Sequence, residues 1–185
     1  MAPTEDPGTD PNEGADAGAL VRLGRRDRDR IRAVVNAAAR AYEGVIPAEH
    51  YSEPYMGADE LAEALDAMEF FGVERAGKLV GVMGFQAVDD VRLIRHLYVR
   101  PDHQRQGVGS RLLAAGIDRA GGRPLLVGTW AAAKWAVRFY EANGFENLGN
   151  ERRLFDRYWE VGEAHAAASV VLRYTNGSSA DRKES

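Results

Sequence analysis

The chain has 185 residues, a formal net charge of −4 at pH 7 and no cysteine, with 45% hydrophobic and 28% charged residues. These values are typical of one globular domain with a substantial core. The lack of cysteine excludes disulfides, thiolate zinc sites and a cysteine nucleophile. The negative charge disfavours a nucleic-acid-binding surface, and no apolar run approaches the roughly 20 residues of a membrane span.

Composition divides the chain into three segments. Residues 1–19 are acidic, rich in proline and glycine and without a basic residue, and we expect them to be disordered. They lack the basic region and apolar core of a signal peptide, so a cytoplasmic location is expected. Residues 176–185 are predicted to be a flexible polar tail, and residues 20–175 a single domain.

Hydrophobic periodicity predicts the elements in the first half of this domain. Residues 19–23 predict a first strand, and a helix is expected over 27–42 with Asp27 as its N-cap. A second helix is predicted over 59–68, after a long connection that contains prolines. Strands are then expected over 70–74, 79–88 and 92–99.

The second half continues the alternation of helices and strands. A helix is predicted over 107–120, a buried strand over 125–129, and a helix over 132–143 that ends at Asn-Gly. Late strands are expected over 145–148, 154–159 and 169–174. The order indicates an α/β fold with a central mixed sheet, for which we expect about seven strands and about four helices.

The most informative motif lies where the helix over 107–120 begins. Residues 104–109 read Gln-Arg-Gln-Gly-Val-Gly. A helix start presents free backbone N–H groups and the positive end of the helix dipole, and glycine lets an anion approach closely. The motif therefore predicts a phosphate or pyrophosphate site. It has neither the lysine of a Walker loop nor the third glycine of a dinucleotide fingerprint.

Two segments, in order, resemble the GNAT acetyltransferase superfamily. The pattern Gln-x-x-Gly-x-Gly, after a strand that ends in Leu-Tyr-Val at 97–99, resembles the coenzyme A loop of that family. The run Phe-Tyr-Glu-Ala-Asn-Gly-Phe at 139–145 resembles the segment that ends its next helix. The resemblance covers roughly residues 20 to 148. It implies a GNAT-like sheet with a coenzyme A cleft between two splayed strands, acetyl-CoA as cosubstrate and no metal.

The resemblance also implies which residues hold the coenzyme. Strand backbone groups bind the pantetheine arm and the loop binds the pyrophosphate; the matching residues are Leu97, Tyr98, Val99, Arg105, Gln106, Gly107, Val108, Gly109 and Ser110. The side chains of Leu97 and Val99 are expected to be core residues of the strand, because the contact with the coenzyme would be through the backbone. Many members carry Asn where this chain has Ala133, so that contact is missing here or is supplied by Trp130 or Lys134.

Acetyl transfer to an amine needs a proton acceptor, a donor for the oxyanion and a proton for the leaving thiolate. The resemblance makes Tyr140 the candidate general acid, and a packed aromatic side chain is the alternative. The family's strand acid is matched by Leu93, which removes the easiest base. His96 on the same strand is the candidate base. His50 and a water chain are the alternatives.

The expected acceptor side is acidic. From Glu43 to Glu74 the chain has nine carboxylates and no Lys or Arg, in the region that walls the acceptor site of the family. This charge predicts attraction of a cationic amine, and a solvated surface is the alternative. Tyr51 and Tyr55 lie in a loop of this region and are candidate substrate residues.

Taken together, the resemblance predicts an N-acetyltransferase that moves an acetyl group from acetyl-CoA to a primary amine by direct attack in a ternary complex. The acceptor is expected to be a small molecule or a peptide, with no nucleic-acid or membrane partner. A homodimer is an open alternative to a monomer. The alternative function is a non-catalytic acyl-CoA-binding sensor or regulatory module.

Overall fold

Seven strands form one mixed sheet in a computed structural model of the chain, which describes residues 18–175. The sheet order is β1-β2-β3-β4-β5-β7-β6, and all neighbours are antiparallel except β4 and β5. The strands are β1 (Ala19–Leu23), β2 (Glu69–Arg75), β3 (Lys78–Val88), β4 (Val91–Val99), β5 (Leu125–Trp130), β6 (Phe145–Asn147) and β7 (Ser169–Tyr174). The predicted tails lie outside the described residues, except that Gly18 is described and Ala19 begins β1.

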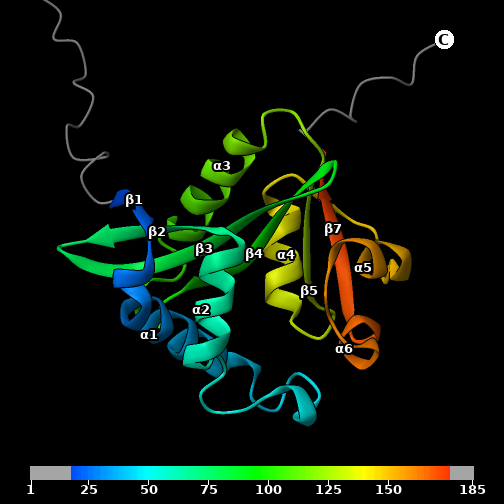
Figure 1. Cartoon of the computed structure of the whole chain (residues 1–185), viewed down its shortest axis with the longest axis horizontal. Helices are drawn as coiled ribbons and strands as arrows, with labels where there is room; N and C mark the ends of the chain where they lie inside the picture. The colour runs from blue at the N-terminus through cyan, green and yellow to red at the C-terminus, as the bar shows by residue number, and fades with distance from the viewer. Residues whose placement is uncertain (1–17, 176–185) are drawn as a thin grey trace, which may run out of the picture.

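Helices lie on both faces of this sheet (Figure 1). They are α1 (Arg28–Ala39), α2 (Ala58–Ala67), α3 (Val108–Ala120), α4 (Lys134–Ala142), α5 (Arg152–Tyr158) and α6 (Glu163–Ala167). Neighbouring strand residues point to opposite faces, and Phe70 and Phe71 of β2 show which helices each face carries. Phe70 packs in the cluster of α1 and α2, whereas Phe71 packs in the cluster of α3 and α4.

The third apolar cluster lies under α5 and α6. Leu93 of β4 packs there with Phe155 and Trp159, while its neighbour Ile94 faces α3. The strand predicted over 154–159 is wrong, because these residues form most of α5. The buried residues of this segment are spaced as on one face of a helix: Phe155, Tyr158 and Trp159. In so short an apolar run, this spacing cannot be told from that of a buried strand. With α5 and the unpredicted α6, the helices number six within the part of the chain that is described.

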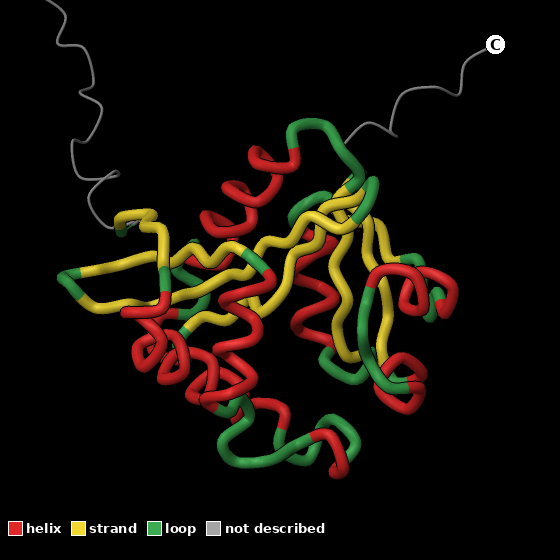
Figure 2. Tube along the Cα trace, in the orientation of Figure 1, coloured by secondary structure: helices red, strands yellow, loops and turns green. Residues whose placement is uncertain are grey.

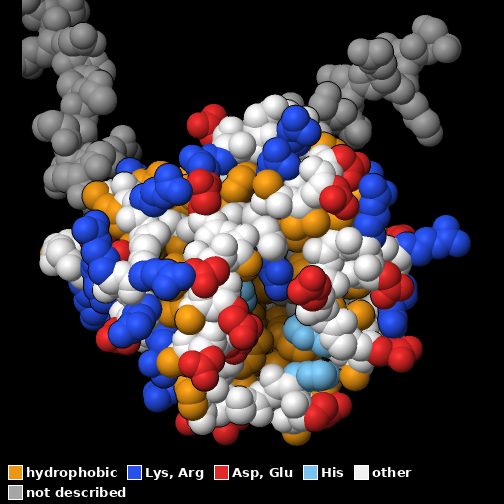
Figure 3. Space-filling model, viewed as in Figure 1, with side chains coloured by type: hydrophobic (Ala, Val, Ile, Leu, Met, Phe, Trp, Pro, Cys, Tyr) orange, Lys and Arg blue, Asp and Glu red, His pale blue; other side chains and the backbone are white. Residues whose placement is uncertain are grey.

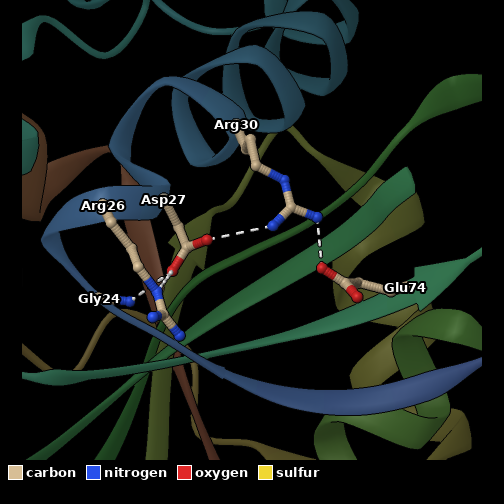
Figure 4. A network of polar contacts seen from close by, with 5 residues as sticks. All are labelled: Gly24, Arg26, Asp27, Arg30 and Glu74. Carbon is tan, nitrogen blue, oxygen red and sulfur yellow. Dashed lines mark hydrogen bonds and ion pairs between the residues drawn. The ribbon is translucent and has the colours of Figure 1, made fainter. Parts of the chain in front are cut away.

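A polar network fixes the start of α1 (Figure 4). Asp27 stands at the predicted N-cap position, but its carboxylate makes no cap bond to α1. It instead accepts hydrogen bonds from the Gly24 N–H at 3.0 Å and from Arg30 at 3.1 Å, and Arg30 also pairs with Glu74 of β2. Helix α1 is thereby tied to the sheet by a buried carboxylate and a shared arginine.

The connection between α1 and α2 is mostly loop (Figure 2) and lies at the open end of the sheet. It includes short 3-10 turns at Arg40–Tyr42 and Ala48–His50. The imidazole of His50 lies 5.2 Å from the Trp130 ring and 5.6 Å from the His165 ring, measured between centroids. The loop therefore reaches across to the end of β5 and to α6. Within residues 18–175, no helix is both long and apolar enough to cross a membrane.

Candidate functional site

The sheet opens between β4 and β5. These parallel strands pair at Arg92 with Leu125, Leu93 with Leu126 and Ile94 with Val127, and at no later residue. Beyond Ile94 the two strands diverge (Figure 1), which leaves the facing backbone edges without each other as partners. The predicted splayed-strand cleft is therefore present.

A bulge in β4 stands at the point of divergence. Gly84 of β3 pairs with Arg95 and Val82 pairs with Tyr98, so β4 uses one residue more than β3 over this step. The backbone of His96 is left-handed there, with φ of +51°. A bulge of this kind ends regular pairing and redirects side chains next to it. It places His96 and Tyr98 on the wall of the cleft.

The glycine-rich loop follows β4 and ends in the helix start that the sequence predicts. Gly107 is the N-cap of α3 with φ of +80°, and the first helical bond runs from the Arg111 N–H to the Gly107 carbonyl at 3.0 Å. The N–H groups before Arg111 thus precede the helical ladder, as an anion site requires. A Cβ at Gly109 would lie 3.1 Å from the Phe139 ring, so this position packs tightly on α4.

Side chains hold the loop from two directions. Gln104 donates a hydrogen bond from Nε2 to the Val99 carbonyl at 3.1 Å, and Arg75 of β2 donates to the side-chain and backbone oxygens of Gln106 at 2.5 and 3.0 Å. Arg105 adopts a left-handed conformation with φ of +59° and is exposed. The loop geometry suits a bound pyrophosphate. The assignment of individual coenzyme-binding residues stays a prediction.

A cavity of about 460 Å³ lies in the splay, on the face of the sheet that carries α1, α2, α5 and α6. Its walls come from the α1–α2 connection, from β4 and β5, and from the segment around α6. Figure 3 shows this hollow, with apolar side chains on its floor, histidine side chains at its edge and acidic side chains on its rim. We call this cavity the acceptor cleft.

Aromatic side chains form one wall of the acceptor cleft. The Tyr55 ring lies 5.4 Å from Tyr42 and 6.4 Å from Tyr98, and its hydroxyl accepts a hydrogen bond from Trp130 Nε1 at 3.1 Å. Tyr55 therefore lies where a substrate residue was predicted. Tyr51 does not line this cleft: it borders a separate cavity of about 360 Å³ beside α1.

The positions considered for the missing coenzyme contact are differently placed. Ala133 is fully buried, and Lys134 is exposed at the first turn of α4. The indole N–H of Trp130 is already used by Tyr55. Lys134 is thus the one of the two proposed replacements that has a side chain free to approach a coenzyme phosphate.

The candidate acid Tyr140 is buried in the cluster between the sheet and α4. Its ring lies 5.2 Å from Phe139 and 5.6 Å from Phe145. Burial raises the pKa of Tyr140 far above its ordinary value, and the nearby Tyr42 adds to the shift. The phenol therefore keeps its proton at every working pH. Its burial agrees with the packed-aromatic alternative, and its role as an acid stays a prediction.

The candidate base His96 lines the acceptor cleft, but its surroundings make it a weak base. Its ring lies nearly parallel to Phe70, with the centroids 6.0 Å apart. Burial, and then the adjacent Arg95, lower the pKa of His96 to about 4. The imidazole is neutral at pH 7 and holds a proton poorly. Leu93, at the position of the family's strand acid, is fully buried in the cluster under α5.

Two further imidazoles line the cleft, and one of them was not predicted. His165 of α6 stacks on Trp130 with the ring centroids 4.1 Å apart, next to His50. Burial lowers the pKa of His165, with smaller contributions from His50 and Arg95. His50 was an alternative base, and its position fits that expectation. His165 lies in a short alanine-rich helix whose sequence gives no sign of the cleft.

Arginines from other segments compensate part of the acidic stretch. Four of its carboxylates are ion-paired: Glu53 with Arg40, Asp66 with Arg25, Glu69 with Arg22 and Arg119, and Glu74 with Arg30. Of the nine carboxylates, Glu60 lines the acceptor cleft, and Glu160 faces it from the α5–α6 connection. This pairing supports the solvated-surface interpretation over a concentrated field for a cationic amine.

Comparison with known proteins agrees with this geometry. A family model for the acetyltransferase (GNAT) domain matches residues 66–147, from the end of α2 through β6. The match includes β4, the glycine-rich loop and the segment around Tyr140. The match identifies residues 66–147 as a GNAT acetyltransferase domain. A domain of this family is an acyltransferase, and the sheet with its splayed strands β4 and β5 has the GNAT arrangement.

Solved structures share the fold of this chain. PaiA N-acetyltransferase from Thermoplasma acidophilum, in complex with coenzyme A, is 16% identical with a TM-score of 0.64, over 85% of this chain and 98% of that one. The ribosomal-protein-S18-alanine N-acetyltransferase from Escherichia coli is 18% identical with a TM-score of 0.60, over 90% and 99%. A GNAT-family acetyltransferase from Staphylococcus aureus Mu50 is 13% identical with a TM-score of 0.66, over 84% and 97%. No curated protein sequence matches significantly.

Proposed function

We propose that the protein is an acetyl-CoA-dependent N-acetyltransferase that acts on a primary amine by direct attack in a ternary complex. One observation carries the proposal: the splay of β4 from β5 opens directly into an aromatic-lined cleft and lies next to a helix start with left-handed Gly107. A thioester held along β4 would have its diphosphate at the α3 N-terminus and its acetyl group at the cleft. The PaiA neighbour, which holds coenzyme A, has this fold.

The residues have separable tasks in this proposal. Backbone groups of Leu97 to Val99 pair with the pantetheine arm as an added strand would, and the N–H groups at the start of α3 bind the diphosphate. The amine nitrogen forms a bond to the acetyl carbon while the carbon–sulfur bond breaks. The nitrogen loses a proton to an imidazole or water in the cleft, and the thiolate gains one from Tyr140.

The acceptor enters from the side of the acceptor cleft. Tyr55, held by Trp130, forms its wall, and the loop that contains His50 closes its end. A small molecule or a peptide terminus fits a cavity of about 460 Å³. Residues 20–175 act as one domain in this proposal. A cytoplasmic location suits a chain without cysteine.

Initial-velocity measurements of coenzyme A release with a panel of amines test the proposal. Release should require both acetyl-CoA and an amine and give intersecting reciprocal plots, because both substrates must be bound before the acetyl group moves. Parallel plots would indicate an acetylated enzyme and contradict direct attack. Tight acetyl-CoA binding without transfer to any amine, and without slow hydrolysis of the thioester, would support the sensor alternative instead.

A further inference from the structure

One partly buried basic side chain lines the acceptor cleft. Arg95 stands on β4 immediately before the bulge, and its Nη1 donates a hydrogen bond to Gln86 Oε1 of β3 at 3.1 Å. Guanidinium carries five N–H donors and no acceptor. The neutral amide of Gln86 uses one of them, and the fork otherwise borders the cleft that Arg95 lines.

Arg95 has no ion-pair partner among the described residues, although it is partly buried. Burial lowers its pKa, and the opposing influence comes from Glu160, which is exposed and lies beyond ion-pair distance. Among residues 18–175, no carboxylate lies within 4.0 Å of the Arg95 guanidinium. By contrast, the guanidinium of Arg30 pairs with both Asp27 and Glu74. A partly buried charge without an ion-pair partner favours an anionic ligand beside it.

The other charged and titratable groups that line the cleft do not provide a second cation for an anionic ligand. His50, His96 and His165 are imidazoles, and burial keeps the pKa of His96 and His165 below the ordinary value. Glu60 and Glu160 are exposed carboxylates of the lining. Arg95 is therefore the cationic group available to an anion inside the cleft.

The coenzyme is not the expected source of that anion. Its diphosphate belongs at the start of α3, which follows β4, whereas Arg95 precedes the bulge and stands at the opposite end of the strand segment assigned to the pantetheine arm. The cavity that Arg95 lines is also walled by α6 and by the α1–α2 connection. An anion at Arg95 is thus carried by the acceptor.

We propose that Arg95 binds a carboxylate of the acceptor, so that the acceptor is an amine that also carries a carboxylate, of the amino-acid class. This inference rests on the proposed acetyl transfer. A guanidinium fork matches a carboxylate in bidentate geometry, which fixes orientation as well as charge. The amine would then approach the acetyl group beside the bulge, within reach of the cleft imidazoles.

The test uses matched acceptors: amino acids, their C-terminal amides and the corresponding decarboxylated amines. For the best amino acid, kcat/KM should exceed that of its amide by about tenfold to hundredfold, the usual range for a charge-assisted hydrogen bond. Arg95→Gln should remove this preference, because kcat/KM should fall far more for the amino acid than for the amide. Arg92→Gln is the control, because Arg92 lies on the same strand and donates to the Val91 carbonyl, outside the cleft.

Each outcome decides between the claims. Amides or neutral amines that equal the amino acids, or a preference that survives Arg95→Gln, would overturn the role of Arg95 and leave acetyl transfer intact. Calorimetry on the coenzyme A-loaded protein tests whether amino acids bind without being acetylated. Carboxylate-specific binding that depends on Arg95, without turnover, would support Arg95 and contradict the proposed function.

A second variant covers a loss of folding. If Arg95→Gln no longer binds coenzyme A, Arg95→Lys keeps the charge but not the planar fork. Arg95→Lys should weaken transfer to the amino acid more than transfer to the amide. An equal loss for the acid and the amide would overturn the proposal.

Discussion

His96 shows how burial alters a single side chain in the cleft. Its pKa is about 4 in the folded chain, against an ordinary value of 6.5, and burial is the main cause. The unfolded chain therefore binds more protons between these two values. The contribution to stability is complete above pH 6.5 and is lost as the pH falls towards 4, with a slope of up to about 1.4 kcal/mol per pH unit.

Replacement of His96 by Asn should remove this pH dependence. Asn tolerates the left-handed backbone that the bulge imposes, with φ of +51° at this position. We expect the unfolding free energy of His96→Asn to decline less than that of the wild type between pH 7 and pH 4. Urea unfolding across this range measures the difference. Parallel curves for the two proteins would show that His96 titrates normally in the folded state.

Tyr140→Phe separates the two interpretations of the buried tyrosine. The variant keeps the ring that packs between Phe139 and Phe145 and removes the hydroxyl alone. If Tyr140 protonates the leaving thiolate, kcat should fall by about 10²–10⁴ with little change in KM. Steady-state kinetics with a melting curve as control provides the test. Turnover equal to that of the wild type would identify Tyr140 as a packing residue.

Residue roles in the cleft were only partly predictable. Tyr51 and Tyr55 occupy the same loop, yet only Tyr55 reaches the cleft, because Trp130 of β5 holds its hydroxyl. Arg95 and His165 gave no signal at all. Arg95 and His165 lie on elements that are far apart in sequence and line one cavity only in the folded chain. Hydrophobic periodicity reports on single elements and gives no information about contacts between distant ones.

At the scale of elements, the start of α3 carries the strongest prediction. Gly107→Glu would place a carboxylate where the diphosphate is expected and should abolish coenzyme A binding. Gly122→Glu is a matched control: both glycines have φ near +80° and open space at the Cβ position, so the two variants share the same backbone strain. Calorimetry with coenzyme A measures both. An equal affinity of the two variants for coenzyme A would show that the diphosphate does not bind at this loop.

Two elements illustrate how closely the sequence predicted secondary structure. The strand over 19–23 coincides with β1, and the helix over 107–120 with α3 to within one residue. The segment over 154–159 was assigned as a strand because a short apolar run fits a strand and a helix equally well. The segment packs against Leu93 and Leu126 as the helix α5. This packing belongs to the tertiary structure and could not be read from the local sequence.

At the scale of the whole molecule, the proposed function depends on one opening in an otherwise continuous sheet. β1 to β4 and β5 to β7 are joined by the three residue pairs between β4 and β5. Helices α1 and α3 pack on opposite faces of the first half, and α5 and α6 cover the second. The coenzyme loop and the acceptor cleft therefore meet at the splay from different sides.

Hydrogen exchange with and without acetyl-CoA tests this central claim most directly. Binding should slow exchange at the amides of Leu97 to Val99 and at the start of α3, because both would donate to the coenzyme. Peptides from α5, on the far side of the cleft, should exchange as before. Protection confined to other segments, or no protection at β4 and α3 at saturating acetyl-CoA, would contradict the account.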